Sequence, residues 1–408
     1  MHRLHATAHT VVALMLTTAA VLIPTRAALA QTPNQAQPQA QPAPLDISDI
    51  LRKIAQDHPR VPALAAVVIE GDRITMEGVT GVRAAGSPER ATLDDQWHLG
   101  SCTKAMTATL AAMLVEQGAL SWDSNPVQSF PDLAKGADES WKEATLLRLI
   151  TNRAGAPADL APRGLWGRLW NSNETPANLR RMLLEGVMSR ATEFPPGTDY
   201  KYSNTNFAIA GMLIERAAQQ PWESVIEHRL FAPLNITSAG FGAPGLQGVI
   251  SQPRGHTPDG KPVQPGHDAD NPQAIAPAGT AHMSIRDWAK FVSLHLRGDA
   301  ANPHRSCRLL TPASFDTLHT APDAHEYAGG WGLATRDWAG GEGPRKGRVL
   351  THAGSNTSWF CVAWLAPARD FAVLVCTNIA GEDGPAAADA AAAALIQKES
   401  ELHPPASR

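Results

Sequence analysis

Charged side chains are scarce in this sequence. Asp, Glu, Lys and Arg make up 18% of the 408 residues, and the formal net charge at pH 7 is only −4. No stripe of lysine and arginine is present, so the composition argues against nucleic acid as a partner. Hydrophobic residues make up 43% of the chain, which permits a sizeable core and excludes wholesale disorder.

Several short motifs of catalysis and cofactor binding are missing as well. There is no Gly-x-Ser-x-Gly elbow, which disfavours an α/β-hydrolase, no His-Glu-x-x-His zinc motif, and no phosphate-binding glycine pattern. The scattered histidines, including His256, His267 and His282, lack the spacing of metal ligands. We interpret them as loop or packing residues and expect neither a metal site nor a cofactor.

Long apolar runs are rare, and the one at residues 11–23 lies near the start of the chain. Basic residues including Arg3 precede it and the small-residue tripeptide 28–30 follows, as in a secretory signal peptide. The run is short for a membrane span, although an uncleaved N-terminal anchor is the alternative. We expect residues 1–30 to be a signal peptide and residues 31–44, rich in Pro, Gln and Ala, to be a disordered tether. The protein is then exported, periplasmic or secreted, with no integral membrane span after signal removal.

Only four cysteines are present, and export would permit disulfides. Cys361 and Cys376 lie in two β-rich segments on either side of a predicted turn at residues 367–370. If Ala368 and Arg369 are the loop residues, the two cysteines lie directly opposite each other, close enough for a possible disulfide. Two free buried thiols are the alternative interpretation.

Strand-like and helix-like patterns are unevenly distributed. β-rich segments occur near both ends, at residues 63–79 and 331–377, whereas short helical patterns fill most of the middle. This order predicts an α/β (α+β) fold, in which an antiparallel sheet built from both chain ends is flanked by helices. We assign the sheet domain to residues 45–100 and 281–402, and an inserted, mostly helical domain to residues 101–280. A cleft between the two is a common place for a ligand.

The segment LGSCTKAMTATLAAML, residues 99–114, predicts a helix that is apolar nearly all round and therefore buried on most sides. Ser101 and Lys104 are three residues apart, so they share one face of it. A buried lysine readily loses its proton, and a neutral amine can accept the hydroxyl proton of a neighbouring serine. Taken alone, the motif fits a helix-capping serine and a solvated lysine equally well.

Tyr202 and Asn204 stand at the start of another apolar helical pattern. A phenol beside a cationic lysine can be pulled toward phenolate and shuttle protons. An amide can accept a hydrogen bond from Lys104 and donate one to a substrate carbonyl. A core tyrosine and an N-cap asparagine are the structural alternatives.

A third motif, His352-Ala353-Gly354-Ser355, enters the C-terminal β-rich region. Glycine permits a ligand to approach the strand edge, and the following backbone N–H can complete an oxyanion hole. On its own the histidine also fits a packing role beside a turn. The three motifs, each at a predicted element boundary, together favour a site of nucleophilic catalysis.

With SCTK at residues 101–104, PPGTDYKYSN at 195–204 and HAGS at 352–355, the sequence resembles the serine β-lactamase and penicillin-binding-protein superfamily over residues 51–395. It is most similar to the branch of class C β-lactamases, D-alanyl-D-alanine carboxypeptidases and esterases. The resemblance implies a β-lactamase/transpeptidase-like fold and chemistry without a cofactor.

The resemblance also implies residue roles. Ser101 is the acylated nucleophile, Lys104 its proton acceptor and Tyr202 the proton shuttle. The backbone N–H groups of Ser101 and Ser355 form the oxyanion hole. The implied substrate-binding residues are Asn204, His352, Gly354 and Ser355.

His352 stands where most β-lactamases of this superfamily carry lysine. A lysine is a permanent cation suited to a carboxylate, whereas a histidine is in general largely neutral at pH 7. Superfamily members with His-x-Gly include peptidases and esterases as well as some β-lactamases. The substitution does not affect the predicted nucleophile, but it leaves β-lactams, peptides and esters as alternative substrates.

The sequence thus predicts an exported serine hydrolase that forms a covalent acyl-enzyme at Ser101 on amide or ester substrates. Its partner would be a small-molecule or peptide substrate: a β-lactam, a D-amino-acid peptide or an ester. One alternative is a catalytically inactive protein of the same fold that binds cell-wall fragments or serves as a scaffold. A second alternative is a short-chain carboxylesterase.

Overall fold

The computed structural model describes residues 42–403. The predicted signal peptide and most of the predicted tether lie outside the described residues. Residues 43–403 form one compact unit. Across the described range, no helix has the length and apolar character needed to cross a membrane.

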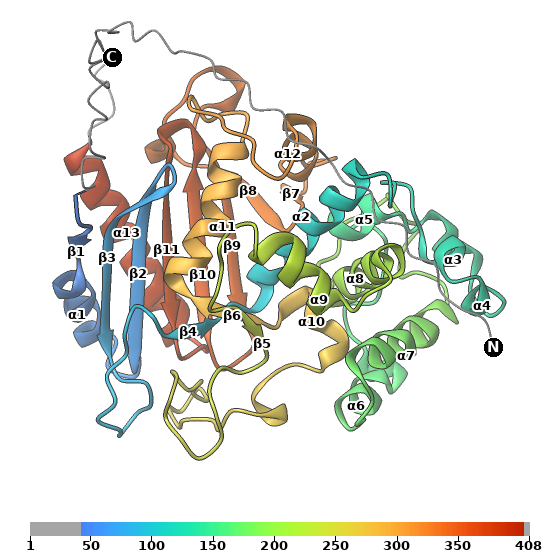
Figure 1. The fold of residues 1–408 in the computed structure, drawn as a ribbon, viewed down its shortest axis with the longest axis horizontal. Helices are drawn as coiled ribbons and strands as arrows, with labels where there is room; N and C mark the ends of the chain where they lie inside the picture. The colour runs from blue at the N-terminus through green and yellow to red at the C-terminus, as the bar shows by residue number, and fades with distance from the viewer. Residues whose placement is uncertain (1–41, 404–408) are drawn as a thin grey trace, which may run out of the picture. The chain divides into compact units, whose positions relative to one another are not determined.

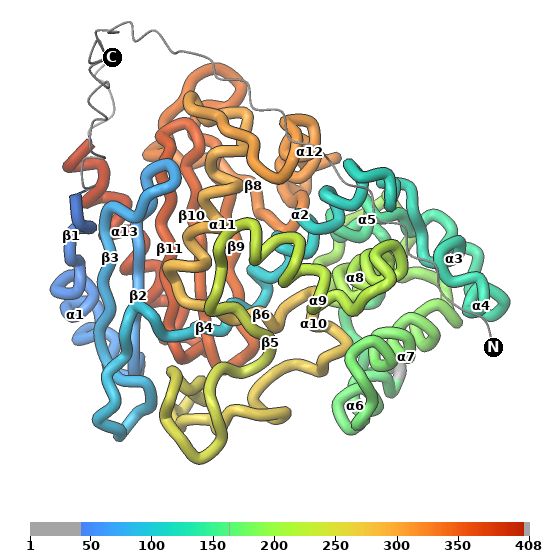
Figure 2. Tube along the Cα trace, viewed as in Figure 1, coloured from blue at the N-terminus to red at the C-terminus, as the bar shows by residue number. Residues whose placement is uncertain are grey.

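An eight-stranded sheet forms one side of the molecule (Figure 1). Neighbouring strands are antiparallel except for the β1–β3 pair, which is parallel. In spatial order the strands are β1 (Leu45–Asp46), β3 (Arg73–Gly81), β2 (Ala63–Glu70), β11 (Phe371–Thr377), β10 (Phe360–Ala366), β9 (Arg348–Ser355), β8 (Trp331–Thr335) and β7 (Tyr327–Ala328). The N-terminal and C-terminal strands meet where β2 pairs with β11, and the two lie side by side in Figure 2. The prediction of an α/β fold with a sheet built from both chain ends is confirmed.

The central strands are apolar on both faces because both faces are covered. Leu64 and Val68 of β2 pack on the side of two helices, α1 (Ser48–Asp57) and α13 (Asp383–Leu402). The alternating residue Val67 packs on the opposite side, which is covered by α11 (Ile285–Gly298). Continuous runs of branched apolar residues, rather than alternating ones, are typical of strands covered on both faces.

The second part of the molecule is helical (Figure 1, right). Several of its short helices begin at a side-chain cap: Thr145 accepts from the N–H of Arg148, and Thr175 from that of Asn178. The helices are α2 (Thr103–Glu116), α3 (Pro126–Ser129), α4 (Pro131–Ala134), α5 (Leu146–Ile150), α6 (Leu165–Trp170), α7 (Pro176–Met188), α8 (Asn204–Ala218), α9 (Trp222–Ile226) and α10 (Ala276–Gly279). The short helix α12 (Pro312–Leu318) follows α11 and packs against α2.

The two parts share apolar packing. Leu110 of α2, Leu213 of α8 and Leu374 of β11 belong to one core cluster. The division into a sheet domain and an inserted helical domain stays a prediction.

A small second sheet was not predicted from the sequence. Its strands are β4 (Gln96–His98), β6 (Ala281–Ser284) and β5 (Gly240–Phe241), in the order β4–β6–β5. All three strands are too short to show a periodic pattern in the sequence. This sheet matters for the site because β4 ends just before Ser101, while β6 follows α10.

The hairpin of β10 and β11 has the predicted register, with Cys361 directly opposite Cys376. The possible disulfide between them is absent, however, and all four cysteines are free thiols. The Cys361 thiol is directed elsewhere: its Sγ lies 3.2 Å from the carbonyl oxygen of Leu99 and 3.6 Å from Sγ of Cys102. The alternative of free buried thiols therefore holds for Cys361 and Cys376.

Candidate active site

Ser101 lies in a short 3₁₀ turn, Gly100–Cys102, that continues directly into α2. Lys104 lies in the first turn of α2, and its Nζ is 3.0 Å from Oγ of Ser101. The helix is buried at every position from Thr103 to Leu114, so Lys104 is 0% exposed. The two side chains are therefore in contact at the start of a buried helix, as predicted from the sequence.

The buried ammonium of Lys104 has only uncharged hydrogen-bond acceptors. Besides Ser101, Nζ donates to Oδ1 of Asn204 at 2.7 Å and to the carbonyl oxygen of Ala278 at 2.8 Å. Burial without a carboxylate partner lowers the pKa of Lys104 to about 7. In the neutral amine, two N–H groups serve Asn204 and Ala278, and the lone pair is left for Ser101.

Tyr202 covers this group from the side. Nζ of Lys104 lies 4.7 Å from the centre of the Tyr202 ring, and the phenol hydroxyl bonds with the Ser101 side chain. Although the residue exposes 38% of its surface, desolvation raises the pKa of Tyr202, and the hydrogen bond with Ser101 only partly opposes this. Desolvation thus favours the protonated form of the phenol. It remains a proton donor.

The end of β9 brings the third motif to the same place. The His352 ring lies 6.3 Å from the Tyr202 ring between centres. Two residues on, Gly354 passes so close to the Ser101 turn that a Cβ would lie 2.0 Å from the carbonyl oxygen of Leu99. Only glycine fits this crossing.

Ser355 is in contact with the turn itself. Gly100, at φ +47°, has no room for a side chain because a Cβ there would lie 2.4 Å from the backbone nitrogen of Ser355. The backbone that carries the N–H of Ser101 therefore touches the backbone that carries the N–H of Ser355. The oxyanion hole implied by the resemblance stays a prediction, and this close approach is compatible with it.

Two further groups of the site were not among the predicted site residues, although their segments at 277–291 and 327–333 share in the resemblance. The Tyr327 ring lies 6.1 Å from both the Tyr202 and the His352 rings, between centres. Its only signal in the sequence is an aromatic residue ahead of a Gly-Gly pair. The carbonyl of Ala278, which accepts from Lys104, has no signal at all, because any residue carries such a group.

A cavity of about 400 Å³ lies beside the long segment that joins β5 to α10. None of the predicted site residues lines it. The lining residues are Pro176, Glu223, Phe241, Gly242, Ala243, Gly266, His267, Asp270, Asn271, Gln273, Ala276 and Thr280.

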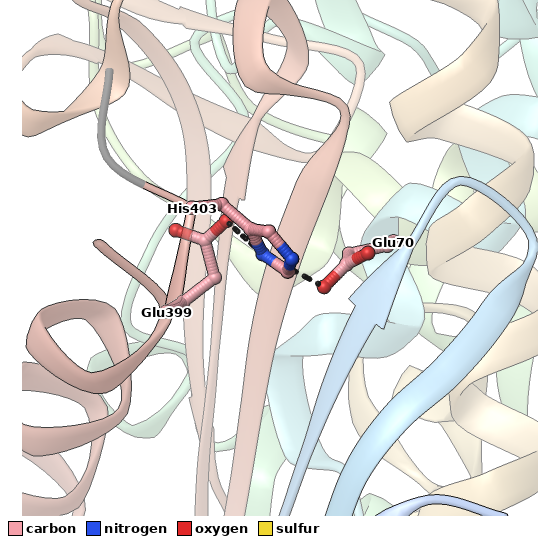
Figure 3. Close-up of side chains that lie close together, drawn as sticks. All are labelled: Glu70, Glu399 and His403. Atoms are coloured by element: carbon pink, nitrogen blue, oxygen red, sulfur yellow. Dashed lines mark ion pairs between the residues drawn. The ribbon is translucent and has the colours of Figure 1, made fainter. Parts of the chain in front are cut away.

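Within the described residues, one group has the makings of a metal site: Glu70, Glu399 and His403 (Figure 3). Nδ1 of His403 lies 3.4 Å from Glu70 and 3.6 Å from Glu399. Glu399 already pairs with the guanidinium of Arg369, a cation that would repel a metal ion. The group instead ties the end of α13 to the end of β2.

The family is established by comparison. Residues 51–398 match the family model described as Beta-lactamase. The chain belongs to this family, and its general class is that of the serine hydrolases.

Similarity to individual proteins is more distant. Penicillin-binding protein 4 of Amycolatopsis lactamdurans is 26% identical over 331 residues, which cover 78% of this chain and 81% of that protein. Protein flp of Staphylococcus aureus (strain N315) is 20% identical over 339 residues, and this chain spans only 60% of its length.

Solved structures with the same fold include D-alanine carboxypeptidase AmpC from Burkholderia cenocepacia and D-amino acid amidase from Ochrobactrum anthropi SV3. The first superposes with a TM-score of 0.62 at 20% identity, covering 86% of this chain and 99% of that chain. The second has a TM-score of 0.67 at 18% identity, covering 86% and 98%. At these identities the likeness concerns the fold.

Proposed function

We propose that this protein is an exported serine hydrolase that acts through a covalent acyl-enzyme at Ser101 on amide or ester substrates. The observation that supports this most is the 3.0 Å contact between Oγ of Ser101 and Nζ of Lys104, a fully buried lysine whose pKa is lowered to about 7. A nucleophile and a base poised near neutral pH thereby stand within hydrogen-bond reach.

Acylation begins with proton transfer from Oγ of Ser101 to the neutral amine of Lys104, while Oγ bonds to the acyl carbon. The carbonyl electron pair moves onto its oxygen, where the backbone N–H groups of Ser101 and Ser355 stabilise the charge. When this intermediate collapses, the bond to the leaving nitrogen or oxygen breaks. The leaving group takes the proton of the Tyr202 hydroxyl, and Lys104 returns its proton to Tyr202.

Deacylation runs through the same groups. Water attacks the acyl carbon and gives its proton to the Lys104–Tyr202 pair, and Oγ of Ser101 leaves with a proton from that pair. Asn204, held by its hydrogen bond from Lys104, has its amide N–H₂ free to orient the substrate carbonyl.

We infer three substrate classes: β-lactams, D-amino-acid peptides and small esters. The names of the relatives, which include a penicillin-binding protein, a D-alanine carboxypeptidase and a D-amino acid amidase, support the first two. His352 at the position of the usual lysine favours substrates that do not depend on a permanent cation. Export rests on the signal-like segment at residues 1–30, and an exported protein whose N-terminus lies near Gln31 would support it.

The test is turnover by the Ser101→Ala variant against a panel of a chromogenic β-lactam, a D-Ala-D-Ala peptide and a p-nitrophenyl ester. We expect turnover of the accepted substrate to fall by at least about 10³-fold, because the variant lacks the nucleophile. The exposed Ser189 supplies the matched control: Ser189→Ala should keep full activity. Unchanged turnover in Ser101→Ala would refute the proposal.

A further inference from the structure

A buried histidine contacts the turn that carries the nucleophile. His98 ends β4, is fully buried and stacks on the indole of Trp359 with ring centres 5.5 Å apart. Its Nδ1 accepts the backbone N–H of Gly100 at 3.1 Å. Because Nδ1 is an acceptor, the proton of the neutral ring is on Nε2.

That Nε2 lies 2.9 Å from Oδ1 of Asp270, which is only 8% exposed. Asp270 belongs to the long segment before α10 and also borders the 400 Å³ cavity. The ring of His98 therefore has one hydrogen bond, from the N–H of the residue before the nucleophile to Nδ1. Its Nε2 lies at ion-pair distance from the carboxylate but makes no hydrogen bond within the described part of the chain.

The same carboxylate oxygen accepts two hydrogen bonds, one of them from the backbone N–H of Asn271 at 2.8 Å. Nδ2 of Asn356 donates to Oδ1 of Asp270 at 3.1 Å and to the carbonyl of Ala269 at the same distance. Asn356 directly follows Ser355. Oδ1 of Asp270 therefore accepts a hydrogen bond from the residue after Ser355, and it lies 2.9 Å from the ring that accepts the N–H of Gly100 in the Ser101 turn.

Asp270 is an unusual choice for a purely structural contact. Its other oxygen, Oδ2, is buried and has no hydrogen-bond partner within the described part of the chain. An asparagine would be easier to bury, and buried unsatisfied groups in native proteins usually have a reason outside stability.

We propose that Asp270 is a positioning residue, which acts through His98 and Asn356 to hold the backbone N–H groups of Ser101 and Ser355 at the spacing that a developing oxyanion needs. Oxyanion stabilisation depends on preorganised donor positions, and functional groups must be held within about 0.5 Å of the productive geometry. Residues that orient the ligands of metal sites from behind are worth about 10- to 100-fold, and we expect an effect of the same order here. The proposal rests on the proposed function, since it concerns the same reaction.

The experiment compares Asp270→Ala, Asp270→Asn, His98→Phe and the double variant Asp270→Ala/His98→Phe with the wild type. The probe is a fluorophosphonate, whose phosphoryl oxygen occupies the position of the oxyanion. Intact-mass spectrometry gives the labelling rate of Ser101, and an accepted ester gives kcat and KM. Asp287, another buried aspartate at 5% exposure, supplies the control Asp287→Asn.

We expect Asp270→Ala to lower kcat and the labelling rate by about 10- to 100-fold, with KM within about twofold of the wild type, because the substrate is bound before the oxyanion forms. Asp270→Asn should recover part of the loss through its remaining Oδ1, and Asp287→Asn should match the wild type. The double variant should be no slower than the slower single variant, because both changes break one chain.

Labelling rates for Asp270→Ala and His98→Phe within twofold of the wild type would overturn the inference, as would a loss confined to KM. If Asp270→Ala does not fold, Asp270→Asn and Asn356→Ala decide the matter by the same criteria. A wild-type protein that is not labelled at Ser101 refutes the proposed function instead, so the two failures are distinguishable.

Discussion

At the residue scale, the site combines two groups whose pKa values are moved in chemically useful directions by the same cause. Burial lowers the pKa of Lys104 to about 7 and raises that of Tyr202. The amine becomes a base at neutral pH, while the phenol keeps its proton and serves as an acid. Groups whose environments separate their pKa values in this way divide acid and base roles between them.

The first prediction concerns the pH profile. Protonated Lys104 has no lone pair for the Ser101 hydroxyl, so kcat/KM should rise with pH on a limb centred near pH 7. Steady-state rates on an accepted ester between about pH 5 and 9 measure this limb. Lys104→Arg, whose guanidinium does not lose its proton, should be inactive throughout. A limb centred near pH 10 would show that burial does not shift the amine.

The second prediction tests Tyr202 as the acid that protonates the leaving group, separately from Ser101 as the nucleophile. Tyr202→Phe should slow hydrolysis of an amide by about 10²- to 10⁴-fold, because an amine must be protonated as it leaves. Acylation by a p-nitrophenyl ester, whose leaving group departs as an anion, should be affected much less. Pre-steady-state bursts measure the acylation step, and equal losses for both substrates would contradict Tyr202 as the acid.

At the element scale, the site depends on the close crossing of the Ser101 turn and the end of β9. Gly354→Ala would place a methyl group 2.0 Å from the carbonyl oxygen of Leu99. We expect the free energy of unfolding to fall by about 3 kcal/mol, the upper end of the usual range for overpacking. Activity should fall as well. Thermal unfolding and ester turnover measure the two effects.

The control for this change is Gly167→Ala in α6, where the added methyl meets no described atom within 4 Å. Its melting temperature should be unchanged or higher, because alanine favours a helix over glycine by about 1 kcal/mol. If Gly354→Ala melts like the control and keeps its activity, the crossing is looser than the structure shows.

A chain of buried polar groups links α2, α11 and α12. Nε2 of His295 lies 2.9 Å from the hydroxyl of Thr109, its Nδ1 lies 2.9 Å from Nε2 of His319, and Nδ1 of His319 lies 2.9 Å from Oδ2 of Asp299. Burial lowers the pKa of both histidines. Folding therefore keeps them neutral at pH values where the unfolded chain would bind protons.

This arrangement predicts acid lability. As the pH falls through about 6.5, the histidines bind protons in the unfolded state but stay neutral in the folded state. The free energy of unfolding therefore decreases. Denaturant unfolding at pH 7.5, 6.5 and 5.5 measures the slope. His319→Gln should be less stable at pH 7.5 but show a flatter slope, whereas His228→Gln, at an exposed site, should keep the wild-type slope. Equal slopes for the wild type and His319→Gln would contradict this origin.

At the scale of the whole molecule, the sheet separates a supporting side from the side that carries the site. Leu395 of α13 is fully buried in the cluster on the supporting side, whereas α2 belongs to the cluster on the other. Leu395→Ala should cost about 2–5 kcal/mol in the free energy of unfolding. The kcat per folded molecule should stay within about twofold of the wild type at temperatures well below the melting temperature.

Leu402, exposed at the end of the same helix, provides the control, and Leu402→Ala should change stability by no more than about 0.5 kcal/mol. Chemical denaturation and active-site titration give stability and kcat separately. A fall in kcat of Leu395→Ala that parallels its loss of stability would show that the two sides of the sheet are coupled.

Features set by short-range patterns were predictable from the sequence. The spacing of Ser101 and Lys104 on one helix and the register of Cys361 with Cys376 follow from helix and hairpin geometry alone. Helix ends depend on individual caps: α5 begins at Leu146 because the side chain of Thr145 caps it.

Features that depend on tertiary contact were not predictable. The raised pKa of Tyr202 follows from desolvation by residues that are distant in the sequence. His98 and Asp270 come together only because β4 and the segment before α10 meet in space. Each of these residues has an ordinary sequence context, so no local pattern distinguishes it.

The pairing of β2 with β11 delays completion of the sheet during synthesis of the chain. The two strands are about 300 residues apart, since Glu70 lies opposite Phe371, and the middle of the sheet cannot close until nearly the entire polypeptide has left the ribosome. Such distant pairings slow folding and leave early strands open in the meantime. For a protein that crosses a membrane, as proposed above, this delay is useful, because a translocation channel threads a chain that has not yet closed.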